Sequence, residues 1–347
     1  MLGNRVENYF LKHIVHILAS SGTGGMESHV QTLCNALSSH FRVTVIVPAE
    51  MSGFAPDVQV ITLKTLSGSR WNLLLHFRLW KLLKALNPDL LHVHGSKAAQ
   101  LVASKGYQCF KRVATVHGIK KKSRFLLGFN QVIAVSEAVK LQLERQGFAS
   151  AISVILNGVV PFSPPVCPQE DRGTAHPFSV IAIGRLAPVK GFDLLIRAWP
   201  LVREAKLRIA GDGPERPQLL SLIEANGLED RIELLGHRDD VRDLLLASDL
   251  LVISSHREGM PLVLAEALHA RCPVVSTAVG GMVGFLPECA LTASGDSVAL
   301  ARKINEVLSD LPTFSRTFEA LYDFARTRLT VEAMAEQTTR IYKRILG

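Results

Sequence analysis

The sequence lacks the features that would place the protein outside the cell or across a membrane. Its five cysteines are scattered and form no Cys-x-x-Cys pair, so neither a disulfide framework nor a cysteine zinc site is expected. No apolar run is long enough to be a transmembrane helix. The stretch HIVHILASS (13–21) is too short and too interrupted by His13 and His16 for a signal peptide. We therefore expect reduced thiols and a cytoplasmic location.

The charge is unevenly distributed. Residues 1–165 carry 18 Lys and Arg against 7 Asp and Glu, a balance of +11, whereas residues 166–347 carry 21 against 24, a balance of −3. A basic N-terminal half favours an anionic partner there, such as a membrane surface, a phosphorylated acceptor or nucleic acid. A merely solubilising surface charge is the alternative.

Strand-like and helix-like segments alternate along the chain. Near-continuous apolar strands separated by helical patterns indicate parallel sheets that are buried on both faces. We predict an α/β protein of two tandem, Rossmann-like, doubly wound domains, with a ligand at the carboxyl ends of the strands in the cleft between them. The short β-branched runs that we interpret as strands are 13–19, 42–48, 90–95, 112–118, 131–136 and 152–158, then 179–184, 205–211, 231–236, 250–255 and 272–277.

Composition also predicts the domain limits. Residues 161–177 contain five prolines in 17 residues, which we interpret as an interdomain linker. The predicted domains are 1–165 and 166–330, followed by a helical segment, 331–347.

A glycine-rich turn follows the first predicted strand, in ASSGTGGMESHV (19–30). Gly24 and Gly25 allow backbone amides to approach a ligand closely, and a helix that opens near Met26 would direct its N-terminus to the same place. The turn is not a Gly-x-Gly-x-x-Gly motif, so a tight turn without a ligand explains it about as well.

Two cations follow the first strand of the second half. Arg185 and Lys190 flank a proline-containing turn in IGRLAPVKGFDLL (183–195). Arginine can bind a diphosphate through two hydrogen bonds and lysine acts as a compact charge. At the carboxyl end of a strand, the pair predicts a diphosphate site.

Two acids stand eight positions apart in ISSHREGMPLVLAEAL (253–268). Pro261 suits the first position of a helix, so the helix is predicted to start at Met260 or Pro261 and to leave early amides free for a phosphate. Glu258 would lie in the turn and Glu266 about one and a half turns inside the helix. A carboxylate can accept two adjacent hydroxyls of a sugar or ribose. A surface turn residue and a locally paired acid are the alternative.

Together these segments resemble the retaining glycosyltransferases of the GT-B fold, family 4. The matching pieces span residues 22–281 in the expected order and spacing. They are GTGGME, LLHVHG, ATVHG, VIAVS, VILNGV, IGRLAPVKGFDLLI, IAGDGPE, LLGHRDDV and REGMPLVLAEALHARCPVVSTAVGG.

The resemblance implies a role for each side chain. Glu258 would contact hydroxyls of the transferred sugar and Glu266 the ribose. Arg185 and Lys190 would hold the diphosphate, and His117 would lie beside the anomeric carbon. The catalytic set is therefore His117, Glu258, Arg185 and Lys190.

The resemblance also implies that backbone groups complete the donor site. Amides of the loop before the helix would touch the sugar and phosphates, and the base would rest near GHR (236–238). The full donor-binding set is Gly24, Gly25, Arg185, Lys190, Gly236, His237, Arg238, Glu258, Gly259, Met260, Pro261, Leu262 and Glu266.

The sequence contains no Asp-x-Asp, the motif with which many glycosyltransferases hold a metal. Negative charge grows on the diphosphate as the glycosidic bond breaks, so positive groups must already be in place. Arg185, Lys190 and two helix N-termini would replace a metal. We therefore expect no metal and no other cofactor. The resemblance implies transfer of a hexose (EC 2.4) with retention of configuration, in which residues 1–165 bind the acceptor, residues 166–330 bind the nucleotide sugar and the C-terminal helix, 331–347, crosses back to the first domain.

The expected function is sugar transfer from a nucleotide donor, a UDP-sugar by preference and GDP-mannose as the alternative, to a glycan or lipid-linked acceptor of cell-surface polysaccharide or lipopolysaccharide biosynthesis. The competing functions are a nucleotide-sugar epimerase or glycan phosphorylase on a similar fold, a non-catalytic nucleotide-sugar sensor and a nucleic-acid-binding protein. No lysine signature for pyridoxal phosphate and no nucleic-acid recognition motif is visible, so we expect no nucleic-acid partner.

Two basic and apolar segments lie in the N-terminal half. IKKKSRFLLGF (119–129) is shorter than the family's usual segment there. Through Lys120, Lys121, Lys122 and Arg124 it is predicted to dock on an anionic membrane, at the inner face of the plasma membrane, or on an acidic lipid-linked acceptor. A solvated loop with inward-packed apolar residues is the alternative. RWNLLLHFRLWKLLKAL (70–86) is apolar around most of its circumference and is predicted to be a core-packing helix.

Overall fold

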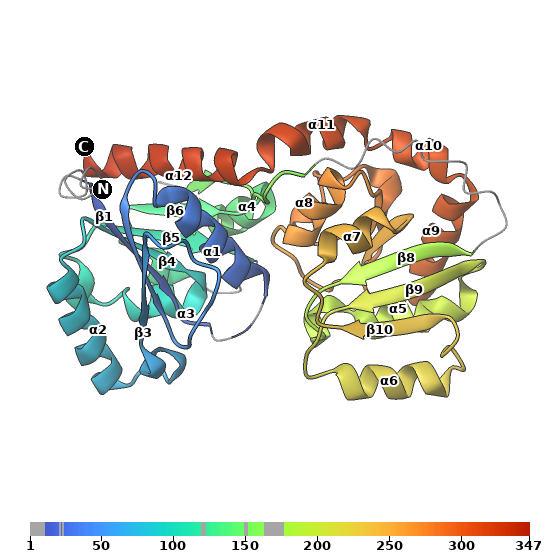
Figure 1. Cartoon of the computed structure of the whole chain (residues 1–347), viewed down its shortest axis with the longest axis horizontal. Coiled ribbons are helices and arrows are strands. Elements are labelled where there is room, and N and C mark those ends of the chain that lie inside the picture. Colours follow the sequence, from blue (N-terminus) through green and yellow to red (C-terminus); the bar gives the residue numbers. More distant parts are fainter. Residues whose placement is uncertain (1–10, 21, 23, 119–122, 149–151, 163–176) are drawn as a thin grey trace, which may run out of the picture. The chain divides into compact units, whose positions relative to one another are not determined.

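A computed structural model describes residues 11–20, 22, 24–118, 123–148, 152–162 and 177–347 (Figure 1). The chain divides into two compact units. The N-terminal unit comprises Met1–Gly158 and Val331–Gly347, and the C-terminal unit comprises Val159–Thr330. The linker predicted at 161–177 falls mostly outside the described residues.

The N-terminal unit is built on a parallel sheet in the order β3-β2-β1-β4-β5-β6-β7. Every residue of β1, β4, β5 and β6 is buried, as expected for strands covered by helices on both faces. The six strands predicted here are confirmed. The strands are β1 His13–Leu18, β2 Arg42–Val47, β3 Val58–Thr62, β4 Leu90–His94, β5 Arg112–Val116, β6 Gln131–Ala134 and β7 Ile152–Val154.

Helices cover this sheet and close its core. The helix α12, red in Figure 1, contributes Met334, Ile341 and Tyr342 to the cluster formed by α1 and the strands. The C-terminal segment of the chain is therefore part of the N-terminal core. The helices of the unit are α1 Gly25–Leu37, α2 Leu73–Leu86, α3 Gly95–Leu101, α4 Glu137–Arg145 and α12 Val331–Leu346, with 3-10 turns η2 Lys64–Ser67, η3 Lys105–Tyr107 and η4 Arg124–Leu126.

The C-terminal unit repeats the architecture with a parallel sheet in the order β10-β9-β8-β11-β12-β13. The five strands predicted here are confirmed. The strands are β8 Phe178–Ile183, β9 Ala205–Ala210, β10 Ile232–Gly236, β11 Leu250–Ile253, β12 Val274–Thr277 and β13 Leu291–Thr292. The helices are α5 Phe192–Ala198, α6 Arg216–Ala225, α7 Val241–Leu246, α8 Leu262–His269, α9 Ser297–Ser309, α10 Leu311–Arg316 and α11 Glu319–Arg328, with 3-10 turns η5 Pro188–Lys190, η6 Trp199–Leu201, η7 Gly280–Met282 and η8 Glu288–Ala290.

The strand order reverses once in each sheet, between β1 and β4 and between β8 and β11. In an open parallel sheet the loops leave a crevice at such a point, and ligands bind there at the carboxyl ends of the strands. The segments singled out in the sequence follow β1, β5, β8 and β11, so they lie at or beside these two crevices.

The prediction for residues 70–86 is wrong in one respect. The helix α2 forms, capped by the Asn72 side chain, which accepts from the amides of Leu74 and Leu75. However, only Leu75, Leu79 and Leu83 are buried. Leu82 and Leu86 are half-buried, whereas Leu73, Leu74, Phe77 and Trp80 are exposed, because only one face of the helix packs against the unit. No helix among the described residues is both long and apolar enough to cross a bilayer.

Candidate active site

The loops after β8 and β11 are joined by backbone contacts in the C-terminal unit. The amide of His256 donates to the carbonyl of Val189 (2.9 Å), and the Ser254 hydroxyl donates to the carbonyl of Lys190 (3.1 Å). Gly191 is left-handed (φ 63°), and a Cβ there would lie 2.4 Å from the Ser254 carbonyl oxygen. Only glycine fits at this approach, which holds Lys190 beside the 254–258 turn.

Lys190 and Glu258 form the central ion pair of this crevice. The Lys190 Nζ lies 2.7 Å from Glu258 Oε1, and the Ser255 hydroxyl donates to the same oxygen over 2.7 Å. The side chains are 24% and 11% exposed, so solvent screens the pair only in part. The structure thus brings together two residues that the sequence predicted separately.

Ser255 was not among the predicted site residues. It is buried, and its carbonyl accepts a hydrogen bond from the Thr277 hydroxyl (2.5 Å). The strand β12 therefore fixes the residue that orients Glu258. The only signal in the sequence was a serine pair directly after an apolar strand.

Arg185 follows Gly184 after β8 and is exposed. Its guanidinium has no ion pair within the described part of the chain. A cation at the end of β8 with no acid to neutralise it is suited to bind an anion.

The helix α8 begins at Leu262, one residue later than the latest predicted start. Pro261 has φ −70°, which its ring requires, but its ψ of 140° is extended, so it is the N-cap residue and not the first helical one. Gly259 and Met260 complete the turn, and Met260 is buried. The free amides at this helix end are therefore those of Leu262 and the residues after it.

Glu266 lies one turn further along α8, on the same face as Leu262. These two are the only residues of the helix that are not buried. Burial raises the pKa of the Glu266 carboxyl, and Arg242 lowers it by a smaller amount. Within the described residues the Glu266 carboxylate accepts no hydrogen bond. A half-buried acid in this state is available for donors from a ligand.

The predicted base-binding residues lie at the carboxyl end of β10. The Gly236 carbonyl accepts from the Gly211 amide (2.7 Å). His237 pairs with Asp239 over 3.3 Å, and Arg238 makes a two-bonded pair with Asp240. The side chains of His237 and Arg238 are thus engaged with neighbouring acids, and the backbone is the part of this loop left to contact a base.

In the N-terminal unit, Gly24 is the N-cap of α1 and Gly25 its first residue. The carboxylate of Glu27 lies in the first turn, 3.3 Å from where a Cβ on Gly24 would be. An acid at a helix N-terminus stabilises the helix. The turn thus has the predicted form, and the helix start already has one anion beside it.

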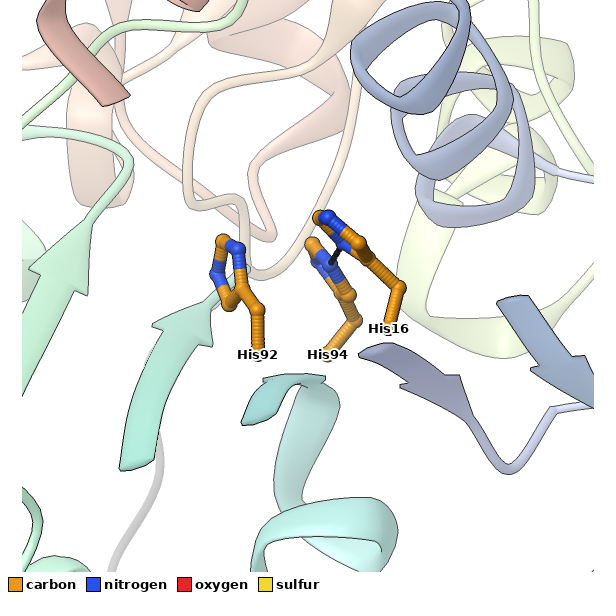
Figure 2. Close-up of side chains that lie close together, drawn as sticks. All are labelled: His16, His92 and His94. Carbon is orange, nitrogen blue, oxygen red and sulfur yellow. Dashed lines mark hydrogen bonds between the residues drawn. The ribbon is translucent and has the colours of Figure 1, made fainter. Parts of the chain in front are cut away.

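A cluster of histidines occupies the crevice between β1 and β4. Figure 2 shows His16 from β1 beside His92 and His94 from β4. The Nδ1 of His16 lies 3.0 Å from the Nε2 of His94, whose Nδ1 lies 3.4 Å from the Nε2 of His117 at the end of β5. All three drawn rings are fully or almost fully buried.

The cluster continues to the C-terminal helix. The Nε2 of His92 lies 2.7 Å from the Thr115 hydroxyl, and its Nδ1 bonds the Tyr342 hydroxyl. That hydroxyl lies 3.5 Å from the Nε2 of His16. One continuous row therefore runs from Thr115 through His92, Tyr342, His16 and His94 to His117.

Burial keeps these imidazoles neutral. It lowers the pKa of His16 to about 3, with a further lowering by His29, and it holds the pKa values of His92 and His94 well below the usual range. Burial also lowers the pKa of His29 to about 4, and the nearby Asn157 side chain raises it by a smaller amount. Neither ring nitrogen of His29 is close enough and well enough aligned to form a hydrogen bond within the described residues. The ring of His29 contacts that of His117 edge-on at 4.6 Å.

The histidine nitrogens could also be ligands for a metal ion. Those of His16, His92 and His94, and those of His29, His94 and His117, lie within 4.8 Å of one another. Neutral imidazoles suit zinc. In the first set, hydrogen bonds among the histidines and to Thr115, Tyr342 and His117 already account for these nitrogens. In the second set, neither ring nitrogen of His29 has a hydrogen-bond partner among the described residues.

A hollow of about 190 Å³ lies beside His117. It is mostly apolar, and Met26, Gly95, Phe125 and Leu126 line it together with His117. Phe125 and Leu126 therefore pack inward, which favours the inward-packed alternative for that part of the 119–129 segment. Lys120, Lys121 and Lys122 lie outside the described residues.

Comparison with known proteins identifies both units. The description "Glycosyltransferase Family 4" matches residues 23–161, and "Glycosyl transferases group 1" matches residues 177–310. A lipopolysaccharide core biosynthesis glycosyltransferase, LpsD of Rhizobium meliloti (strain 1021), is 26% identical over 78% of this chain and 80% of its own. The GPI3 subunit of the phosphatidylinositol N-acetylglucosaminyltransferase of Saccharomyces cerevisiae (strain YJM789) is 27% identical over 74% of this chain, which spans 60% of that subunit.

Among solved structures, Anabaena HepE in complex with UDP and glucose superposes with a TM-score of 0.80 over 96% of this chain and 100% of its own, at 23% identity. Because the superposition covers 96% of this chain, the agreement in fold includes both sheets. With two family descriptions that together cover most of the chain, the protein belongs to the family 4 glycosyltransferases of the GT-B fold.

Proposed function

We propose that the protein transfers a hexose, with retention of configuration and without a metal, from a nucleoside-diphosphate sugar to a glycan or lipid-linked acceptor in cell-surface polysaccharide or lipopolysaccharide biosynthesis. The observation that carries the proposal is the Lys190–Glu258 pair beside Arg185 at the reversal between β8 and β11. A cation for a diphosphate and an acid for a sugar stand within 2.7 Å of each other there.

The two cations are assigned to the leaving group. Diphosphate oxygens would compete with Glu258 for Lys190, and Arg185 would add a two-bonded contact. Because the negative charge increases as the glycosidic bond breaks, both contacts strengthen toward the transition state. Glu258, held by Ser255, keeps an oxygen for hydroxyls of the transferred sugar.

The helix α8 is assigned to the nucleotide. Its first amides would contact phosphate, and Glu266 on the same face would accept the two ribose hydroxyls. Ligand hydroxyls would provide the hydrogen bonds that the half-buried Glu266 carboxylate lacks. The Gly236 loop is assigned to the base through its backbone. From the N-terminal unit we assign Gly24 and Gly25 to the diphosphate and His117 to the sugar.

The relatives support the choice of donor and acceptor. LpsD is named for lipopolysaccharide core biosynthesis and GPI3 for a phosphatidylinositol N-acetylglucosaminyltransferase, so both names include a molecule with a lipid part. HepE was solved with UDP and glucose. We therefore favour a UDP-sugar, with GDP-mannose as the alternative, and a cytoplasmic protein that works at the inner face of the plasma membrane.

The proposal is tested by incubating the protein with a panel of nucleotide sugars, with and without lipid-linked acceptors, and measuring nucleoside diphosphate and glycosylated product. Transfer requires both products in the presence of acceptor. An isomerised nucleotide sugar without acceptor would identify an epimerase, and binding without turnover would identify a sensor. A thermal-shift comparison of UDP with GDP selects the base, because a ligand that binds only the folded state raises its stability.

We expect Glu266→Gln and Glu258→Gln to separate binding from turnover. Glu266→Gln removes a charge-assisted contact to ribose and should therefore raise the dissociation constant for UDP about tenfold or more. Glu258→Gln should leave UDP affinity nearly unchanged and lower kcat with the full donor, because the sugar is absent from UDP. Calorimetry with UDP measures the first effect, and exposed Glu224→Gln is the matched control. Equal loss of UDP affinity in both variants would contradict this division of roles.

We expect full activity after dialysis against excess EDTA. Lys190 and Arg185 already supply positive charge where the diphosphate would lie, and the sequence has no Asp-x-Asp. Initial rates with and without added Mg²⁺ or Mn²⁺ measure the effect. A strict requirement for either ion would overturn the assignment of the two cations.

A further inference from the structure

We infer that one face of α2 docks the N-terminal unit on an anionic lipid bilayer. This outer face consists of Trp71, Leu73, Leu74, Phe77 and Trp80 with the cations Arg70, Arg78, Lys81 and Lys84. The inference stands apart from the transfer chemistry, because none of these residues belongs to the proposed donor site.

The spacing of the apolar residues divides α2 into two faces. Leu75, Leu79 and Leu83 recur at i, i+4 and i+8 and are buried against the unit. Leu73, Phe77 and Trp80 recur at i, i+4 and i+7 on the opposite side. Leu73 is 84% exposed and Phe77 62% exposed, and Trp71, just before the helix, is 77% exposed. Such a contiguous apolar strip on one helix indicates a surface with a partner.

The charge around this strip has a single sign. No acidic residue occurs from position 58 to position 88, whereas Arg70, Arg78, Lys81 and Lys84 are all exposed there. The Lys84 ammonium lies 5.6 Å from the centre of the Trp80 ring, and the Arg70 guanidinium lies 5.1 Å from that of Trp71. Indole rings and cations side by side suit the headgroup region, where apolar rings enter and charges meet lipid phosphates.

A hollow of about 390 Å³ adjoins the outer face. Phe77 and Trp80 form one wall, and Tyr107 with Gly106 of η3 forms the other. Its surface is mostly apolar. It has room for part of an acyl chain once the helix lies on the bilayer.

The sign of the charge argues against a second copy as the occupant. Two outer faces packed together would bring Arg78, Lys81 and Lys84 of both copies into one contact with no acid to pair them, which is unfavourable. An anionic bilayer provides both the opposite charge and the apolar phase. The described part of the 119–129 segment offers less, because Leu126 is buried and only Leu127 (59%) is a strongly exposed apolar residue.

The test is sedimentation of the full chain with vesicles of phosphatidylglycerol and phosphatidylcholine in equal parts, compared with phosphatidylcholine alone. We expect binding to the anionic vesicles that weakens with salt. The double variants Phe77→Ser with Trp80→Ser, and Lys81→Glu with Lys84→Glu, should each lower the partition coefficient at least about tenfold.

Matched controls lie elsewhere on the exposed surface. Leu141→Ser with Leu220→Ser removes two exposed leucines, and Arg203→Glu with Lys206→Glu makes the same change of charge on the C-terminal unit. Both control variants should bind vesicles like the unchanged protein. Melting temperatures of all four variants establish that they are folded.

Tryptophan fluorescence gives an independent readout. The chain has three tryptophans, and Trp199 is fully buried, so quenching by brominated lipid would report Trp71 and Trp80. Absence of quenching, or equal vesicle binding by the folded outer-face and control variants, would overturn the inference. A dimer in light scattering that Phe77→Ser with Trp80→Ser dissociates would overturn it too, because the face would then join two copies.

Discussion

Lowering the pH from 7 to 5 should unfold the N-terminal unit while the C-terminal unit stays folded. His16, His29, His92 and His94 are buried and neutral in the folded unit. Their pKa values lie below the 6.5 that the unfolded chain would have. Within the described residues the C-terminal unit buries only one histidine, His269.

The sign follows from which state binds the protons. Above about pH 6.5 neither state is protonated at these rings, so stability is complete. As the pH falls toward the folded pKa values, about 4 for His29 and about 3 for His16, only the unfolded chain takes up protons. Each such proton lowers the free energy of unfolding by about 1.4 kcal/mol per pH unit, so four approach about 5 kcal/mol per unit. A domain stability of about 5–15 kcal/mol is then lost within a few pH units.

Hydrogen exchange of peptides from β1 and β4, compared with β8 and β11, resolves the two units as the pH is lowered. Denaturant titrations at each pH give the slope. His29→Leu removes one titrating ring and should reduce the slope by about one proton, whereas the exposed His40→Gln should leave it unchanged. Stability that is flat between pH 7 and pH 5, or simultaneous loss of protection in both units, would show that the histidines are not the cause.

Lys190→Ala and Arg185→Ala should each lower kcat/KM for the full donor about a hundredfold, equivalent to about 3 kcal/mol of transition-state stabilisation. In the proposed site, each would remove a contact to the diphosphate oxygens on which the negative charge develops. Lys190→Ala has a second consequence, because Glu258 then keeps only Ser255 as its hydrogen-bond donor. The melting temperature of Arg185→Ala should change little, because Arg185 is exposed and has no ion pair among the described residues. That of Lys190→Ala should fall, because the Glu258 carboxylate, 11% exposed, loses its cation.

Initial rates at several donor concentrations measure this effect, with the exposed Lys206→Ala as the matched control on the same unit. A rate that falls only at low donor concentration would assign the residue to ground-state binding. More than about a third of the original kcat/KM in either variant would remove that residue from the leaving-group site.

The fold could be predicted largely from the sequence because most strands are buried on both faces and therefore form continuous apolar runs. β3 was missed because it is not buried on both faces and so lacks a continuous apolar run. It is an edge strand, and only Val58 of its residues is buried, so VQVIT carries no buried run. The outward face of α2 could not be predicted either. Periodicity marks Leu75, Leu79 and Leu83 as one apolar face, but it does not tell which of two apolar faces meets the sheet.

The site residues that could be predicted are those whose charge and position in the sequence suggest a role without knowledge of their neighbours in space. Arg185, Lys190, Glu258 and Glu266 were visible as charges at strand ends and at a helix start. Contacts between distant segments were not visible. Ser255 becomes informative only when its hydroxyl is seen on Glu258. His92 and His94 alternate along β4 and His16 lies in β1, and nothing in the sequence of either strand shows that the other lies beside it.

When the Tyr342 hydroxyl donates along the row, the hydrogen bonds from Thr115 to His117 can run in either of two directions. A neutral imidazole carries one proton, so each ring donates in one direction and accepts from the other. In one orientation Thr115 donates first, every proton points toward the crevice, and His117 accepts at Nε2 and keeps its own proton on Nδ1. In the other orientation the whole row reverses, and the Nδ1 of His117 carries a lone pair. Tyr342, on the last helix of the chain, is the link between His92 and His16. The proton on one phenol of the C-terminal helix is thereby coupled to whether the Nδ1 of His117 can donate or accept a hydrogen bond.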